Sequence, residues 1–287
     1  MLNRGSAGER PHRLDSMNDI PPAPYLSTDD PSLFESTPLA SAGWYDEGQH
    51  GGVVSALCAH AIEAVPSLTV MEIARLTVEL FRVVPIVPLK VTTEVLREGK
   101  KIQVVAASVV DPAGTELARA VALRLRRTRL ALPQEATTGD THLPPPDTIA
   151  SPDMTRWGIG DGGRILYHRH AIEVREVGAG FTEPGPGAMW LRIHRPLVEG
   201  HPLTPTTRAI ITGDFVNGLS RLADARNFAF MNADLTIHLN RPPAGEWVGV
   251  EAVSTYEPTG RGLATGVLSD TKSPFGRATQ TLFLDAR

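Results

Sequence analysis

Three polar side chains interrupt strand-like stretches in the second half of the chain: Asp234, Thr255 and Gln280. A carboxylate can accept a proton from a water molecule, whereas a hydroxyl and an amide can hold that water by hydrogen bonds. Their neighbours along the chain are mainly β-branched or apolar, as expected for strands in a folded sheet. Three such interruptions on adjacent strands predict a functional site rather than three unrelated structural contacts.

The elements that carry these residues occur twice in the chain. The segment RLTVELFR, beginning at Arg75, aligns with DLTIHLNR, beginning at Asp234, at an offset of 159 residues. Nearly the same offset pairs the next strand and its turn, and also the last strand of each half. A repeat of this length predicts an internal duplication of one helix-plus-sheet unit.

Each half is expected to contain one helix and several antiparallel strands. Apolar residues at three- and four-residue spacing follow the Gly51–Gly52 step and predict an amphipathic helix. The second helix is predicted from about Thr206 to Ala223. Alternating patterns such as KIQVVAASVVD and LARAVALRL in the first half predict half-buried strands. In the second half, strands are predicted around HAIEVREV, AMWLRIHRP, ADLTIHLNRPP, WVGVEAVSTYE, GLATGVLSD and ATQTLFLD.

The two copies differ at the polar positions. Arg75 stands where the second copy has Asp234, and the first copy has no like partner for Thr255 or Gln280. This asymmetry predicts that the second half supplies the chemistry, that the first half shapes the site, and that each chain has one active site.

Length and proline content predict the domain boundaries. The 287 residues suffice for two units of about 100–150 residues. Prolines between about 131 and 161 fix the backbone and remove donors, which is typical of a connection. We therefore expect a flexible segment at 1–24, a first domain at 25–130, a Pro-rich linker at 131–161 and a second domain at 162–287.

Charge and composition exclude several function classes. The net charge of −4 gives no basic surface for nucleic acid, and no apolar run reaches the roughly 20 residues of a membrane span. The N-terminus lacks the apolar core of a secretory signal. The single cysteine, Cys58, excludes an internal disulfide and favours the reducing cytoplasm; in its apolar stretch it is expected to be a buried hydrophobe. The histidines lack metal-ligand spacing, so we expect neither a metal nor another cofactor.

The chain resembles the double hot-dog acyl-CoA thioesterases of the thioesterase II type. The stretch WYDEGQHGGVVSAL is similar to the beginning of that family's first helix, and NRPPAGEW, VSTYEPTGRGLATG and RATQTLFL are similar to its second half. In the family, a catalytic Asp opens a strand ending in Arg-Pro, a Thr or Ser lies six residues before an Arg-Gly turn, and a Gln lies in the last strand. Asp234, Thr255 and Gln280 match that order and spacing.

This resemblance implies an α+β tandem hot-dog fold, in which two long helices are each wrapped by antiparallel sheet. It also implies hydrolysis of an acyl-CoA substrate by a water that Asp234 activates and that Thr255 and Gln280 hold. Backbone N–H groups at Gly51–Gly52 would bind and polarise the thioester carbonyl. The acyl chain is expected between the helices, in a tunnel lined by residues such as Leu57, Ile62, Ile211 and Phe215.

Other interpretations remain open. His50, a departure from the family pattern, could touch the substrate or only cap the helix that follows, and we expect no catalytic role for it. Asp214, inside the second helix, is interpreted as a local structural contact. An enoyl-thioester hydratase would need a histidine at position 219, which is Leu219. A non-catalytic acyl-CoA-binding protein is the alternative function, and sheet edges could still join copies into a homo-oligomer.

Overall fold

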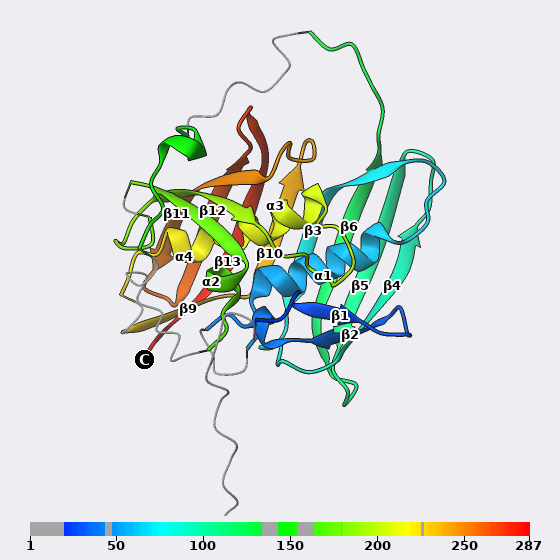
Figure 1. The fold of residues 1–287 in the computed structure, drawn as a ribbon, viewed down its shortest axis with the longest axis horizontal. Helices are drawn as coiled ribbons and strands as arrows, with labels where there is room; N and C mark the ends of the chain where they lie inside the picture. Colours follow the sequence, from blue (N-terminus) through cyan, green and yellow to red (C-terminus); the bar gives the residue numbers. More distant parts are fainter. Residues whose placement is uncertain (1–19, 44–47, 134–142, 154–163, 179, 225–226) are drawn as a thin grey trace, which may run out of the picture.

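One antiparallel sheet of thirteen strands runs through both halves of the molecule (Figure 1). It is seen in a computed structural model that describes residues 20–43, 48–133, 143–153, 164–178, 180–224 and 227–287. The first half contributes β1 (Tyr25–Ser27), β2 (Leu33–Ser36), β3 (Met71–Leu80), β4 (Leu89–Arg97), β5 (Ile102–Val110) and β6 (Glu116–Arg126). The second half contributes β7 (Ile172–Val177), β8 (Gly187–Ile193), β9 (Phe228–Asn232), β10 (Asp234–Leu239), β11 (Trp247–Glu257), β12 (Arg261–Ser269) and β13 (Pro274–Ala286).

The strand order confirms the duplication. The first half runs β1-β2-β4-β5-β6-β3 and the second continues β10-β13-β12-β11-β8-β7. Counted from each outer edge of the sheet toward its middle, corresponding strands of the two halves follow the same order. The two halves join where β3 pairs with β10, and Thr77 lies opposite Thr236 at that junction with their hydroxyl oxygens 3.2 Å apart. These threonines are 159 residues apart, which is the offset of the sequence repeat.

The helices lie against one side of the sheet. The first, α1 (Gly51–Glu63), packs against β3 to β6 and against α3 (Pro205–Gly213) from the second half. Its predicted position is confirmed, and nine of its residues are buried. The remaining helical pieces are α2 (Tyr167–His170), α4 (Val216–Leu219) and the short 3-10 turns η2 (Pro38–Ala40) and η4 (Pro146–Thr148).

The expectation of a second long helix is wrong. In place of one helix from Thr206 to Ala223, α3 ends at Gly213 and a separate turn, α4, begins at Val216. This stretch is rich in Gly, Thr, Asn, Asp and Ser, which are weak helix formers. The break follows Asp214, where the backbone N–H of Asn217 donates to the Gln280 side chain over 3.0 Å.

Part of the Pro-rich segment packs on the second half. Leu143 and Pro146 are buried, and the indole N–H of Trp190 donates to the Pro144 carbonyl over 2.8 Å. The rest of the predicted linker includes 134–142 and 154–161, which lie outside the described residues, as does 1–19 of the predicted flexible segment. Within that segment, the buried Ala23 accepts a hydrogen bond from the Thr37 hydroxyl. No helix within the described ranges is long and apolar enough to cross a membrane.

Gly52 allows α1 and α3 to approach closely, and this contact is testable. A Cβ at Gly52 would lie 2.8 Å from the Cβ of Asp214 and 3.1 Å from the Ile211 carbonyl oxygen. Gly52→Ala should therefore lower the free energy of unfolding by about 1–3 kcal/mol, although alanine ordinarily favours a helix. Chemical denaturation measures this.

The matched control is Gly51→Ala in the same turn. A Cβ there would come no closer than 3.2 Å, to a carboxylate oxygen of Asp214, so a smaller loss is expected. A Gly52→Ala protein as stable as wild type would show that this contact does not limit the approach of the helices.

Candidate active site

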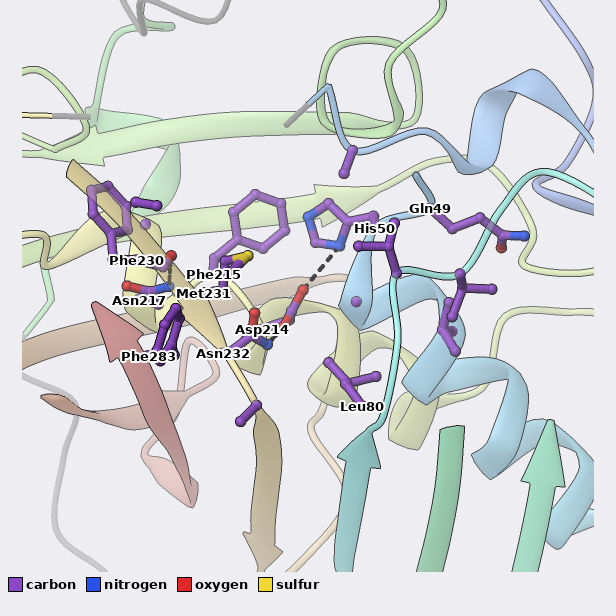
Figure 2. A pocket seen from close by; sticks show the side chains of 18 of the residues that line it. Gln49, His50, Leu80, Asp214, Phe215, Asn217, Phe230, Met231, Asn232 and Phe283 are labelled. Atoms are coloured by element: carbon purple, nitrogen blue, oxygen red, sulfur yellow. Dashed lines mark hydrogen bonds and ion pairs between the residues drawn. The ribbon is translucent and has the colours of Figure 1, made fainter. Parts of the chain in front are cut away.

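A cavity of about 420 Å³ opens where the first turn of α1, the break between α3 and α4, and strand β9 meet (Figure 2). Its volume is in the range of sites for small ligands. Most of its walls are apolar, and its aromatic lining consists of Phe81, Phe181, Phe215, Phe228, Phe230 and Phe283. Two exposed cations, Arg82 and Arg287, also line it.

Asp214 is the carboxylate of this cavity, and its side chain is only 8% exposed. Its Oδ2 accepts a hydrogen bond from the Gly52 backbone N–H at 2.6 Å and lies 3.0 Å from Nδ1 of His50. Its Oδ1 accepts from the side-chain amides of Asn232 at 2.9 Å and Gln280 at 3.0 Å. Both halves of the chain therefore hold this carboxylate, and Figure 2 shows His50 facing it.

Gln280 connects the carboxylate to the helix break. Its side chain is fully buried on the inner face of β13, and its Oε1 accepts from the backbone N–H of Asn217 at 3.0 Å. Its Nε2 points to the Asp214 carboxylate and also lies 3.3 Å from the Asp214 carbonyl oxygen. The single amide thus ties α4 to the residue at the end of α3.

The structure does not bring the three predicted catalytic residues together. Gln280 faces the interior, whereas Asp234 and Thr255 lie on the outer face of the sheet. Oδ1 of Asp234 accepts a hydrogen bond from the backbone N–H of Thr281, on β13, at 2.6 Å. Thr255 pairs across the sheet with Leu263, which is exposed. Successive residues of a strand point to opposite faces, so matching a motif along a strand did not determine the face.

The predicted substrate-binding residues are close to the cavity, with one correction. His50 and Gly51 line it, whereas the N–H of Gly52 is already bonded to Asp214 and is not available to a carbonyl. The N–H of Gly51, at the first position of α1, has no intrahelical partner and forms no hydrogen bond with another described residue. Gly51 is therefore the better placed donor for a ligand.

Sequence reasoning placed neither Asp214 nor Asn232 in this site: Asp214 was interpreted as a local structural contact, and Asn232 was not considered. A signal for Asp214 was present, since a single acid interrupts the otherwise uncharged run AIITGDFVNGL. Asn232 stands two positions before Asp234, and β9, the strand that carries it, was not predicted. Nothing near either residue along the chain indicated its partners, which are distant in sequence.

Burial keeps two other ionisable side chains of this region, His168 and Cys58, in their neutral forms. Burial and the nearby His50 lower the pKa of His168, another lining residue, to about 3, so it is neutral at physiological pH. Cys58 is fully buried, as predicted, and burial raises its pKa to about 12. Within the described residues, no group of three or more His, Cys, Asp or Glu is placed to hold a metal.

Four residues were predicted to line a tunnel between the helices. Of these, only Phe215 lines the cavity, whereas Leu57, Ile62 and Ile211 are fully buried in the core. The cavity lies beside the first turn of α1 because the break after α3 leaves space there.

Solved structures share this fold across nearly the whole chain. A putative thioesterase II from Thermobifida fusca is 12% identical, with a TM-score of 0.69, over 97% of this chain and 100% of that chain. A putative thioesterase from Novosphingobium aromaticivorans is 18% identical, with a TM-score of 0.69, over 91% and 98%. The acyl-CoA thioesterase II TesB2 from Mycobacterium marinum is 14% identical, with a TM-score of 0.64, over 91% and 94%. At these identities they show the tandem hot-dog arrangement alone.

Family models identify the chain itself. The model of the acyl-CoA thioesterase C-terminal domain matches residues 141–284, and that of the N-terminal domain matches residues 40–125. No curated protein matches the chain. The two models occur in the order expected of a tandem protein and cover most of the residues between them. The chain therefore belongs to the acyl-CoA thioesterase family and is a thioester hydrolase.

Proposed function

We propose that the protein hydrolyses acyl-CoA thioesters to a free acid and coenzyme A at Asp214. The observation that carries this proposal is a nearly buried carboxylate, held by donors from both halves, in a mainly apolar cavity. Among the described lining residues Asp214 is the only acid. Its negative charge makes removal of a proton from water favourable where the apolar walls weaken solvent screening.

The fixed donors keep Asp214 in place during the reaction. The amides of Gln280 and Asn232 bond to one carboxylate oxygen and the Gly52 N–H to the other, so the side chain cannot rotate without breaking several bonds. Positioning of this kind keeps the negative charge of Asp214 fixed beside the reacting groups and lowers the cost of orienting them. In this proposal Gln280 keeps its predicted place in the site, and Asn232 replaces Thr255.

The thioester carbonyl is assigned to the first turn of α1. Gly51 lines the cavity, its N–H has no intrahelical partner, and the positive end of the helix dipole favours the negative charge that develops on the oxygen. The acyl group would lie against the aromatic walls. The cations Arg82 and Arg287 would attract the phosphates of coenzyme A.

Asp214 and Asp234 provide a matched pair of variants. Asp214→Asn should lower kcat/KM for acyl-CoA by about 10²–10⁴-fold, because the amide carries no charge to favour proton removal. Asp234→Asn should stay within about twofold of wild type, since Asp234 lies on the outer face. Hydrolysis is measured across several acyl chain lengths, with thermal unfolding as a check on folding.

Wild-type hydrolysis by Asp214→Asn would contradict the assignment, as would an equal loss in Asp234→Asn. Binding of acyl-CoA by the wild type without turnover at every chain length would instead favour an acyl-CoA-binding protein.

Asn232 and Thr255 provide a second pair. Asn232→Ala removes one of the two side-chain amides that hold Oδ1 of Asp214, so kcat should fall by about 10²-fold. Thr255→Ala removes an exposed hydroxyl and should leave kcat unchanged. Steady-state kinetics of both variants test whether the inner or the outer face of the sheet carries the site, and a larger loss in Thr255→Ala would point to the outer face.

A further inference from the structure

His50 lies between the carboxylate and the cavity. It precedes α1 as its N-cap residue, and its Nδ1 is 3.0 Å from Oδ2 of Asp214. Its ring packs against Phe215 and Tyr167, with ring centres 5.0 Å and 5.8 Å away. Only 7% of the residue is exposed, yet it lines the cavity. The imidazole is therefore fixed in one orientation beside the acid.

The contact with Asp214 favours a proton on one of the two ring nitrogens. Because an ionised carboxylate only accepts hydrogen bonds, a ring with its proton on Nδ1 suits this contact. The Gly52 N–H donates both to Nδ1 over 3.1 Å and to the carboxylate over 2.6 Å, and the shorter bond remains when the Nδ1 position carries the ring proton. In the neutral ring Nε2 is then unprotonated, and it forms no hydrogen bond with the residues that the structure describes.

The carboxylate itself has little capacity left for a water molecule. A carboxylate offers about four lone-pair directions. Oδ1 receives the amides of Asn232 and Gln280, and Oδ2 receives Gly52 and faces His50. A water bonded directly to Asp214 would have to displace one of these donors, whereas a water bonded to Nε2 of His50 would displace none.

We propose that His50 is the general base of the hydrolysis and that Asp214 positions it and balances its charge. This inference rests on the proposed function. Nε2 takes a proton from water as the water oxygen bonds to the thioester carbonyl carbon. When the tetrahedral intermediate collapses, the carbon–sulfur bond breaks, and the sulfur leaves with the proton that Nε2 then returns. One water is consumed, and His50 ends the cycle neutral.

The other ionisable groups near His50 do not take this role. Burial lowers the pKa of His168 to about 3, with His50 contributing, and burial raises the pKa of Tyr167 well above its ordinary value. Both are neutral at physiological pH. The positive charge that His50 acquires during the reaction is therefore balanced by Asp214, which is in direct contact with it.

The first test is His50→Asn. Asparagine is a favourable N-cap and can still donate to Asp214, but it has no basic nitrogen. We expect kcat to fall about 10²–10⁴-fold while KM and the melting temperature stay close to wild type. His60→Asn, on the same helix but outside the cavity lining, is the matched control and should retain activity.

The second test uses His50→Ala and added imidazoles. Imidazole should restore part of the activity, and a series of substituted imidazoles should restore more as their basicity rises, as general-base catalysis requires. Rescue that is independent of basicity would show that the added ring only fills space and would overturn the proposal. Added imidazole should restore much less activity to the double variant His50→Ala/Asp214→Asn, because the carboxylate that orients the base is missing.

The outcomes separate this inference from the function on which it rests. Wild-type turnover retained by His50→Asn would leave the thioesterase in place and reduce His50 to a helix cap. Absence of turnover by the wild-type protein with all acyl-CoAs would overturn the proposed function, and the role of His50 with it.

Discussion

The hydrogen bond from the Gly52 backbone to the Asp214 carboxylate connects the two halves of the chain at the site. It is 2.6 Å long and spans 162 positions of the sequence. It forms because Gly52 lacks a side chain, which lets the first turn of α1 reach the end of α3. The N-terminus of a helix favours a negative charge, so the geometry of the contact and its electrostatics agree. The cavity, the break in the second helix and the orientation of His50 all depend on this approach.

The two halves of the duplicated fold differ in the side chains that they place inside the sheet at the site. In the sheet, Thr77 is paired with Val121 and Thr236 with Thr279, so the next inward position is Ala122 in the first half and Gln280 in the second. Both side chains are fully buried. Only the second half therefore places an amide inside the fold at that point. The first half contributes instead the helix terminus that meets the acid.

A buried carboxylate is costly unless its hydrogen bonds are satisfied, and this requirement accounts for the local structure. Gln280 and Asn232 supply the donors from two strands, and Gln280 also accepts the backbone N–H of Asn217 at the start of α4. Continuing α3 as a regular helix through this point would compete with that bond. The break in the helix and the fixed position of Asp214 thus both depend on hydrogen bonds of the Gln280 side chain.

The sequence by itself determined the duplication, the positions of most strands, the first helix and the resemblance to the thioesterase family, because each depends on local periodicity or motif order. It also singled out Gln280, whose side chain the structure places against Asp214. Two features depended on the tertiary structure: the face of the sheet on which each strand residue lies, and the partners of Asp214. A strand alternates faces at every residue, so only the packed sheet could place Asp234 outside and Gln280 inside. The donors that bond to Asp214 come from residues 162, 18 and 66 positions away, so its local sequence could only suggest a helix contact.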